Sequence, residues 1–248
     1  MNVNPVDEKI TIICDKLREY TNGNDLIGLD DMPVEIDKVY SKGQASGGGL
    51  FEKVRGFARI FYQSQWESGT NLVLDVSNHY PSDFYDLQYA FGAAKGLKII
   101  KITATEKKKT NYNYAFSSCN AEIIDLSECN MVSNLAATFQ YDTSLKEIKG
   151  ELDCSYCLYS SNLGNSCFAS CFALLEVRFK PDSIPFSIGF ASSTKLSRES
   201  ITSIINGLSP TTSGMSVSIP KIAKEAAFTD EEWAELIATK PNWTINLV

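Results

Sequence analysis

The feature that most constrains the fold of this chain is a residue pattern that returns about every 24 positions. Each of four segments has a small or sulfur-containing residue, then a phenylalanine, then a turn-like polar or small stretch, then a short apolar run. The segments are 89–103, 114–127, 137–150 and 166–179; their phenylalanines are Phe91, Phe116, Phe139 and Phe168, and the matching apolar positions are Ile100, Ile124, Ile148 and Val177. An earlier apolar run at 72–77 aligns Leu74 with Ile100, and a weaker later copy at 188–201 carries Phe190.

One unit of this size cannot bury its own apolar face, so units of this kind stack and share one core. We therefore expect the four phenylalanines to form a buried aromatic ladder and the four apolar positions to form the inward face of a parallel sheet. The last step, from Ile148 to Val177, is 29 residues instead of 24, and we expect the extra residues, within 154–164, to bulge from the stack as a loop.

The pattern Ala-Phe-x-x-Cys-x-x-Leu-x-x-Ile-x-Leu resembles the BspA-like type of leucine-rich repeat, found in bacterial surface proteins and phage proteins. The resemblance covers about residues 70–200, with its best copies at 166–179 and 114–127. It implies an α/β fold, a leucine-rich-repeat solenoid with short parallel strands, in which Phe and Cys point into the core. Cys119 and Cys171 fall in that Cys position, where the sister copies have Ala94 and Asp142.

The two ends differ in composition from the repeats. Residues 10–40 have the apolar spacing of two short helices, and Ile13, Leu17, Arg18, Thr21, Gly23, Leu29, Met32, Pro33 and Ile36 resemble the N-terminal segment of many phage structural proteins. That resemblance implies an attachment segment at 1–40. A Gly/Ser-rich linker follows at 41–50, then an N-terminal cap at 51–70, the solenoid at 71–200 and a C-terminal α/β cap at 201–248.

The C-terminal cap is expected to alternate helices and strands. A helix is predicted at 196–208, a strand at 215–220 and a final strand at 243–247. Between the strands, Thr229 and Glu232 have the spacing of a capping box and begin a helix whose apolar face is Trp233, Leu236 and Ile237.

Charge and hydropathy exclude several classes of partner. The net charge of −7 argues against nucleic acid, because neutralising phosphates requires clustered Lys and Arg. No apolar stretch approaches the ~18 residues of a membrane span. The N-terminus lacks the basic and apolar regions of a secretory signal, so we expect a protein made in the bacterial cytoplasm. The odd count of seven cysteines indicates a reducing origin more than a disulfide framework.

Candidate catalytic and metal sites are sparse. Cys154, Cys157, Cys167 and Cys171 contain a CxxC half-site that could hold zinc, although the second pair has the wider spacing CxxxC and the repeat already uses Cys171. Packing in the loop and core is the alternative, and the sequence leaves both open. His79 is the only histidine, which excludes mechanisms that need two imidazoles. We expect no enzyme activity, no catalytic residues, no cofactor and no metal.

Tyrosines near the turns of neighbouring repeats are the candidate binding residues: Tyr112, Tyr114, Tyr141, Tyr156 and Tyr159. Aromatic rings with a polar tip suit glycan and protein contacts; the alternative is that half or more of them are core residues. From the resemblance we expect a structural or host-binding component of a phage virion. Its partners would be other virion proteins, through the N-terminal segment, and a host surface protein or glycan, with homo-oligomerisation open. A bacterial adhesin-like protein and a phage-encoded intracellular inhibitor are the alternatives.

Overall fold

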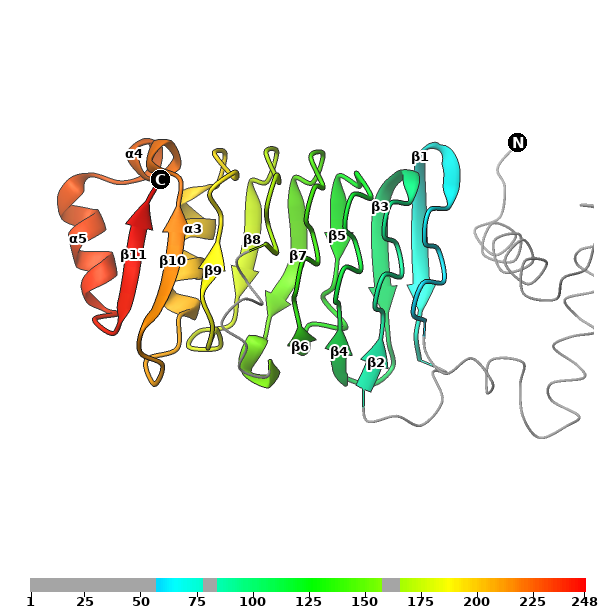
Figure 1. Cartoon of the computed structure of the whole chain (residues 1–248), viewed down its shortest axis with the longest axis horizontal. Coiled ribbons are helices and arrows are strands. Elements are labelled where there is room, and N and C mark those ends of the chain that lie inside the picture. Colours follow the sequence, from blue (N-terminus) through cyan, green and yellow to red (C-terminus); the bar gives the residue numbers. More distant parts are fainter. Residues whose placement is uncertain (1–56, 78–83, 158–165) are drawn as a thin grey trace, which may run out of the picture. The chain divides into compact units, whose positions relative to one another are not determined.

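Parallel strands from successive units build the first sheet of this protein. A computed structural model describes residues 57–77, 84–157 and 166–248, all within one compact unit (Figure 1). The predicted attachment segment, the linker, His79 and Tyr159 lie outside the described residues. The first sheet has the strand order β1-β3-β5-β7-β8. Its strands are β1 (Gln65–Asp75), β3 (Lys95–Thr103), β5 (Ile123–Asp125), β7 (Glu147–Leu152) and β8 (Glu176–Phe179).

A second parallel sheet runs beside the first, and the sequence did not predict it. It has the order β2-β4-β6, and each strand is only three residues long. The 3₁₀ turn η2 (Cys154–Tyr156) follows β6 in this row, joined through a bridge between Met131 and Asp153. The three units that contain these strands thus contribute two strands each instead of the one expected. The strands are β2 (Phe84–Asp86), β4 (Lys109–Asn111) and β6 (Val132–Asn134).

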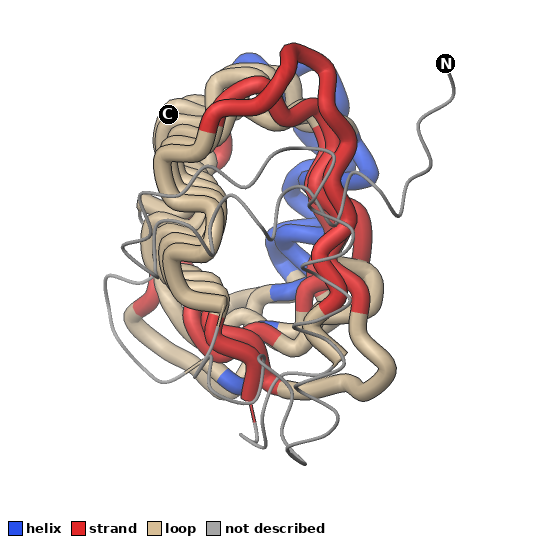
Figure 2. Tube along the Cα trace, turned by 90° about the vertical axis from the view of Figure 1, so that its right-hand side faces the viewer, coloured by secondary structure: helices blue, strands red, loops and turns tan. Residues whose placement is uncertain are grey.

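Tight turns form the third wall of the stack, which Figure 2 shows as layered loops on the side opposite the strands of the first sheet. Two residues per unit adopt the left-handed conformation, with φ between 50° and 62°. These turns direct backbone N–H groups along the stack: Tyr89 donates to the carbonyl of Asn113 at 2.9 Å, and Tyr114 donates to that of Ala136 at 3.0 Å. The two positions in the first four units are held by Arg59, Gln63, Tyr89, Ala93, Tyr114, Ser118, Ala137 and Tyr141; Asn120, with φ 58°, is an additional left-handed residue in the unit of Tyr114.

The predicted phenylalanine ladder is confirmed. The ring centroids of Phe91 and Phe116 are 5.4 Å apart, those of Phe116 and Phe139 are 5.7 Å apart, and those of Phe139 and Phe168 are 5.3 Å apart. Phe190 of the weak copy extends it, 4.5 Å from Phe168. At the other end it continues into the segment expected to be a cap, because Phe61 lies 5.2 Å from Phe91 and its N–H donates to the carbonyl of Ala90.

The inward face of the first sheet has the predicted residues, with one correction of register. Ile124 pairs with both Ile100 and Ile148, and all three side chains are buried. The partner of Ile100 on β1, however, is Leu72 and not Leu74. Irregular pairing between Gln65 and Asn71 shifts β1 by two residues. A shift of two keeps the same side chains on the inward face, which is why the sequence pattern did not detect it.

The C-terminal end has the predicted order of helices and strands, with one added helix. A third parallel sheet, in the order β11-β10-β9, continues the row of turns, because the N–H of Phe190 donates to the carbonyl of Ser218. The predicted capping box of Thr229 and Glu232 is present. The elements are β9 (Ile188–Gly189), α3 (Arg198–Gly207), β10 (Met215–Ile219), the unpredicted α4 (Lys221–Ala227), α5 (Asp230–Ala238) and β11 (Trp243–Leu247).

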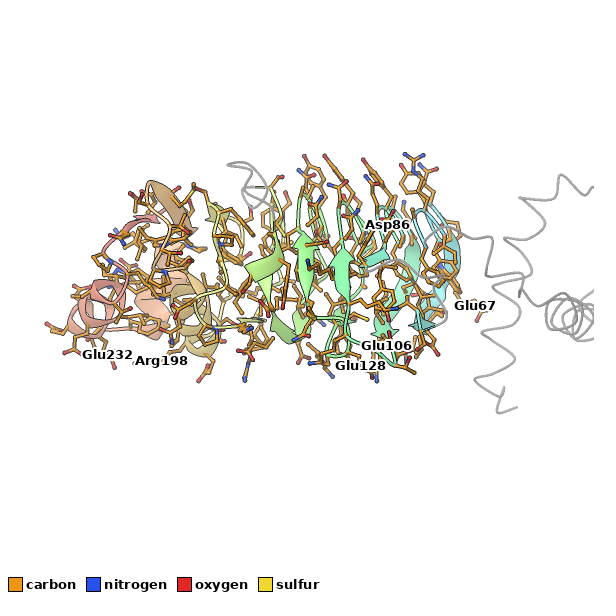
Figure 3. All side chains as sticks on the ribbon, turned by 90° about the horizontal axis from the view of Figure 1, so that it is seen from below. Glu67, Asp86, Glu106, Glu128, Arg198 and Glu232 are labelled. Carbon is orange, nitrogen blue, oxygen red and sulfur yellow. The ribbon has the colours of Figure 1, made fainter. Side chains whose placement is uncertain are left out.

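Helix α3 takes the place that a sixth strand would have beside β8. The N–H of Val177 donates to the hydroxyl of Ser200 at 3.0 Å, and the N–H of Phe179 donates to that of Ser203 at 2.9 Å. Arg198 then ties α3 to α5 through two bonds to the carboxylate of Glu232, at 3.1 and 2.9 Å, and the two residues lie side by side in Figure 3. The first sheet therefore ends on a helix and not on an open strand.

We predict that Phe116→Ala lowers the free energy of unfolding by about 3–5 kcal/mol. Phe116 is fully buried and stacks on rings in both directions, so truncation leaves a cavity and removes the stacking with Phe91 and with Phe139. Phe172→Ala is the matched control, since that side chain is 53% exposed, and a change of less than about 0.5 kcal/mol is expected. Urea denaturation followed by circular dichroism measures both; equal effects of the two substitutions would contradict the ladder's role.

Candidate functional site

Three tyrosines from neighbouring turns form a continuous aromatic surface, which we call the tyrosine strip: Tyr62, Tyr89 and Tyr114. The rings of Tyr89 and Tyr114 are stacked, with centroids 4.8 Å apart and planes within 6° of each other. Tyr62 meets Tyr89 edge-on at 6.0 Å. Tyr62 is 38% exposed and the other two are half-buried, so each of the three side chains is partly accessible to solvent.

The backbone of the turns fixes the positions of these rings. Tyr89 and Tyr114 each lie two residues before a ladder phenylalanine, in the left-handed conformation. That conformation is uncommon for a bulky residue and persists only where the surroundings hold it; here the N–H of each tyrosine is bonded to the next unit. Tyr62 has room to pack because its neighbour Gly92 has no side chain: a Cβ there would lie 3.0 Å from the Tyr62 ring.

One cation and a row of amides border the strip. The guanidinium of Arg59 lies over the Tyr89 ring, 5.1 Å from its centroid. The side-chain amide of Gln88 donates to the side-chain oxygen of Asn113 at 2.8 Å, and that of Asn111 donates to Asp86 at 3.0 Å. Each side chain in this polar row bonds to the unit beside it, so the row has one fixed arrangement. In Figure 3, Asp86 lies nearer the upper side of the stack, and Glu106 and Glu128 lie at its lower side.

The four predicted tyrosines that the structure describes lie in different surroundings. Tyr112 is fully buried, and its hydroxyl donates to the carbonyl of Cys129 at 2.6 Å, so it cannot contact a ligand at the surface. Tyr114 belongs to the strip. Tyr141 is 55% exposed on a later turn, and Tyr156 lies on η2 with the ammonium of Lys109 over its ring. The sequence analysis missed Tyr62 and Tyr89, although Tyr89 has the same spacing from its phenylalanine as Tyr114.

The cysteines of the described residues are core residues. All six are buried and none forms a disulfide. Burial raises the pKa of Cys154 and Cys167 well above the usual value of a thiol, and that of Cys129 to about 12. A thiol held in its protonated form is a poor nucleophile and metal ligand. Within residues 57–77, 84–157 and 166–248, no group of three or more potential ligands has the geometry of a metal site.

The expected loop at 154–164 therefore needs a correction at its start. Cys154 is 0% and Cys157 is 5% exposed, and the thiol of Cys157 donates to the carbonyl of Val132 at 3.4 Å. Both residues thus extend the row of β2, β4 and β6 into the core and do not bulge from the stack. The sequence could not separate these alternatives, because CxxC is compatible with a loop, a metal half-site or a packed turn.

Asp142 is a carboxyl in the core, at the repeat position where its neighbours have Cys119 and Cys171. It is fully buried; one carboxyl oxygen accepts a hydrogen bond from the thiol of Cys119 at 3.1 Å, and the other has no partner among the described residues. Burial raises the pKa of Asp142 from 3.8 to about 7, against the opposing effect of hydrogen bonds to it. Because this carboxyl is fully buried among the described residues, its protonation affects the stability of the fold.

A polar groove lies between α3 and the outer face of β7 and β8. It is lined by charges of both signs, among them Glu147, Glu151, Glu176, Arg178 and Arg198. Glu147 and Glu176 are paired across the two strands, and Glu176 also accepts a bond from the hydroxyl of Ser200 at 3.2 Å. The groove therefore presents charges of both signs beside apolar residues such as Ile148, Phe179 and Pro181.

Comparisons with protein-family models, with characterised proteins and with solved structures find no match to this chain. Among the described residues there is no helix with the length and apolar character to cross a membrane. The fold established by these observations is a mixed α/β one, with stacked parallel sheets and few helices.

We predict that Asp142→Asn makes the protein more stable at pH 8 and flattens the dependence of its stability on pH. The folded-state pKa lies above the unfolded one, so the folded state binds the proton more tightly. The stabilisation is complete below pH 3.8 and is lost as the pH rises through about 7. At 1.36 kcal/mol per pKa unit, the loss in the unmodified protein is about 4 kcal/mol, and the amide removes it.

Asp153→Asn is the control, for which we expect the opposite change in stability. Burial raises the pKa of Asp153, but the hydrogen bonds from Lys180 and Ser155 outweigh it and hold that pKa below its usual value. The ammonium of Lys180 lies 2.7 Å from the carboxylate, so Asp153→Asn should destabilise the protein at pH 7. Urea denaturation at pH 5, 6, 7 and 8 separates the two. An unchanged pH profile in Asp142→Asn would disprove the assignment.

Proposed function

We propose that this protein is a non-enzymatic binding component of a bacteriophage particle, a tail, baseplate or fibre appendage, built on a leucine-rich-repeat solenoid of the BspA-like kind. In this proposal the repeats present the tyrosine strip to the host envelope, where it contacts a surface glycan or protein. The stacked phenylalanines and the parallel pairing of Ile100, Ile124 and Ile148 support the repeat assignment. The phage assignment rests on the resemblance of the repeat and of the N-terminal segment.

The tyrosine strip is the observation that carries the binding role. Its rings are held by backbone bonds and by each other, so a ligand meets a surface whose conformational freedom is already lost. Ordering flexible side chains is a main cost of association, and a preorganised aromatic surface avoids it. A ring edge beside the fixed amides of Gln88 and Asn113 offers apolar contact and hydrogen bonds together, a combination that suits the two chemical faces of a sugar.

A binding role fits the chemistry of the side chains better than catalysis does. The thiols of the described residues are buried with pKa values raised or bonded to carbonyls, and the raised pKa of Asp142 belongs to a group without access to solvent. Perturbed groups at active sites lie in clefts. Here they lie in the core, beneath the turns that hold the tyrosines.

The N-terminal segment at 1–40 would attach the protein to other virion proteins, and the linker at 41–50 would separate it from the repeats. Two other functions use the same surface: an adhesin on a bacterial cell, or an intracellular inhibitor that binds a host protein. Both are binding proteins, and they differ from a virion component in location and in ligand.

We predict that mass spectrometry of purified particles of the source phage detects this chain at a stoichiometric copy number. A virion component is retained through particle purification, whereas an inhibitor stays in the lysate and an adhesin stays with the cell envelope. Absence from particles, together with abundance in infected cells, would reject the virion role and favour the inhibitor.

We predict that Tyr89→Ser combined with Tyr114→Ser weakens binding to immobilised envelope polysaccharides of the host at least tenfold. Each aromatic contact contributes on the order of 1 kcal/mol, and the double change removes the stacked pair. Tyr156→Ser is the control, because Tyr156 is exposed on a different wall of the stack, and it should leave binding within twofold. Biolayer interferometry measures all three proteins, and equal binding by them would exclude the strip as the contact surface.

A further inference from the structure

The outer edge of β11 has backbone groups with no strand beside them. The N–H of Val248 donates to the carbonyl of Ile219, and the N–H of Lys221 donates to the carbonyl of Val248. In a parallel pair, alternate residues of a strand bond to the same neighbour. Thr244, Asn246 and Val248 therefore bond towards β10, and the N–H and C=O groups of Ile245 and Leu247 point outward. β11 is the edge strand of its sheet in the described chain.

The other sheet at this end of the protein is treated differently. The outward N–H groups of β8 are bonded to the hydroxyls of Ser200 and Ser203 on α3, so that edge is covered. Exposed edge strands pair readily with other strands, and proteins usually cover them or place charges or proline on them. β11 has neither device, since its sequence Trp-Thr-Ile-Asn-Leu contains no charge and no proline.

Apolar side chains gather beside this edge. Leu247 is 41% exposed and Val248 57%, and Ile222 at the start of α4 is 61% exposed. Lys221 bonds to Val248, which brings the first turn of α4 next to the end of β11. The chain as a whole carries a net charge of −7, so two copies repel one another over most of their surface. Residues 243–247 of β11 add no charge to that repulsion.

We propose that β11 pairs with β11 of a second copy of this chain, antiparallel and about a two-fold axis at Asn246. In this register Ile245 of one copy faces Leu247 of the other in a hydrogen-bonded pair, and the reverse pair follows by symmetry. Every outward N–H and C=O of Ile245 and Leu247 then meets its complement. The register leaves the N–H of Trp243 out of the pairing, in agreement with its bond to the carbonyl of Lys240 at 3.1 Å.

The side chains support the same register. Ile245 and Leu247 lie on one face of β11, so the two copies form apolar cross-strand pairs there. On the other face Asn246 meets Asn246 of the second copy, and two amides can donate to each other. The two three-stranded sheets become one six-stranded sheet, and the dimer would present two tyrosine strips. The dimer itself does not depend on the binding function proposed above.

Sedimentation velocity of the full chain tests the proposal. The unmodified protein should sediment as a species with twice the 27.4 kDa mass of one chain. Leu247→Pro removes an outward N–H without removing a bond to β10, and Leu247→Lys puts a charge on the edge. Both substitutions should weaken dimerisation at least tenfold while the circular dichroism spectrum is kept. Phe172→Lys, at a 53% exposed residue outside this edge, should leave the dimer intact.

Hydrogen exchange distinguishes pairing of the two β11 strands from a general loss of stability. The amides of Ile245 and Leu247 should be protected at high protein concentration and should exchange quickly on dilution, whereas the amides of Asn246 and Val248 stay protected at both. A monomer at ~200 µM, a concentration at which an association of micromolar Kd is complete, would overturn the proposal, and so would a dimer that both Leu247 variants leave unchanged. The latter result would assign the dimer to another surface.

Discussion

The stack of phenylalanine rings determines the spacing on which the rest of the protein depends. The ring centroids from Phe91 to Phe168 follow one another at 5.3–5.7 Å, close to the ~4.8 Å between paired strands. Because the two distances nearly match, each unit satisfies its aromatic contacts and its backbone hydrogen bonds at once. The same spacing stacks Tyr89 on Tyr114 at the surface. Tyr89 and Tyr114 are thus stacked as the core rings are, whereas Tyr62 meets Tyr89 edge-on.

Stacking also leaves backbone N–H and C=O groups without a partner at the end of each row of strands or turns. A row of strands or turns leaves unpaired donors at its last member, and the two rows at the C-terminal end are handled in different ways. The strand row ends on hydroxyls of α3, which Arg198 and Glu232 hold against α5. The turn row changes into β9, β10 and β11 and ends on an open strand. This difference is the physical basis for assigning self-association to one row only.

The sequence predicted those features that depend on large apolar side chains at fixed spacing. The ladder and the inward isoleucines have such a signal, and the capping box of α5 has a polar one in the spacing of Thr229 and Glu232. The second sheet has none, because its strands are three residues long and include Lys109 and Asn111. The register of β1 was missed because an irregular pairing of two residues leaves the apolar face unchanged.

Burial of the tyrosines shows why the candidate site was predicted only in part. Tyr112 and Tyr114 are two residues apart and have the same chemistry, yet one bonds inside the core and the other lies on the turn. Tyr114 has the left-handed conformation, which breaks the alternation of side chains along an extended chain, and composition carries no record of that change. Only alignment with Tyr89, at the same distance from its phenylalanine, could have separated the two.

The outer face of the first sheet is a less suitable contact surface than the turns, for an electrostatic reason. Lys101 of β3 lies 3.1 Å from the carboxylate of Glu128, and Lys146 lies 2.8 Å from that of Glu122. Charges that already have partners must give them up to bind a ligand, and exposed pairs return little energy. The rings of the tyrosine strip lose no ion pair when they are covered. If the protein binds as we propose, the turns are therefore the more suitable contact surface.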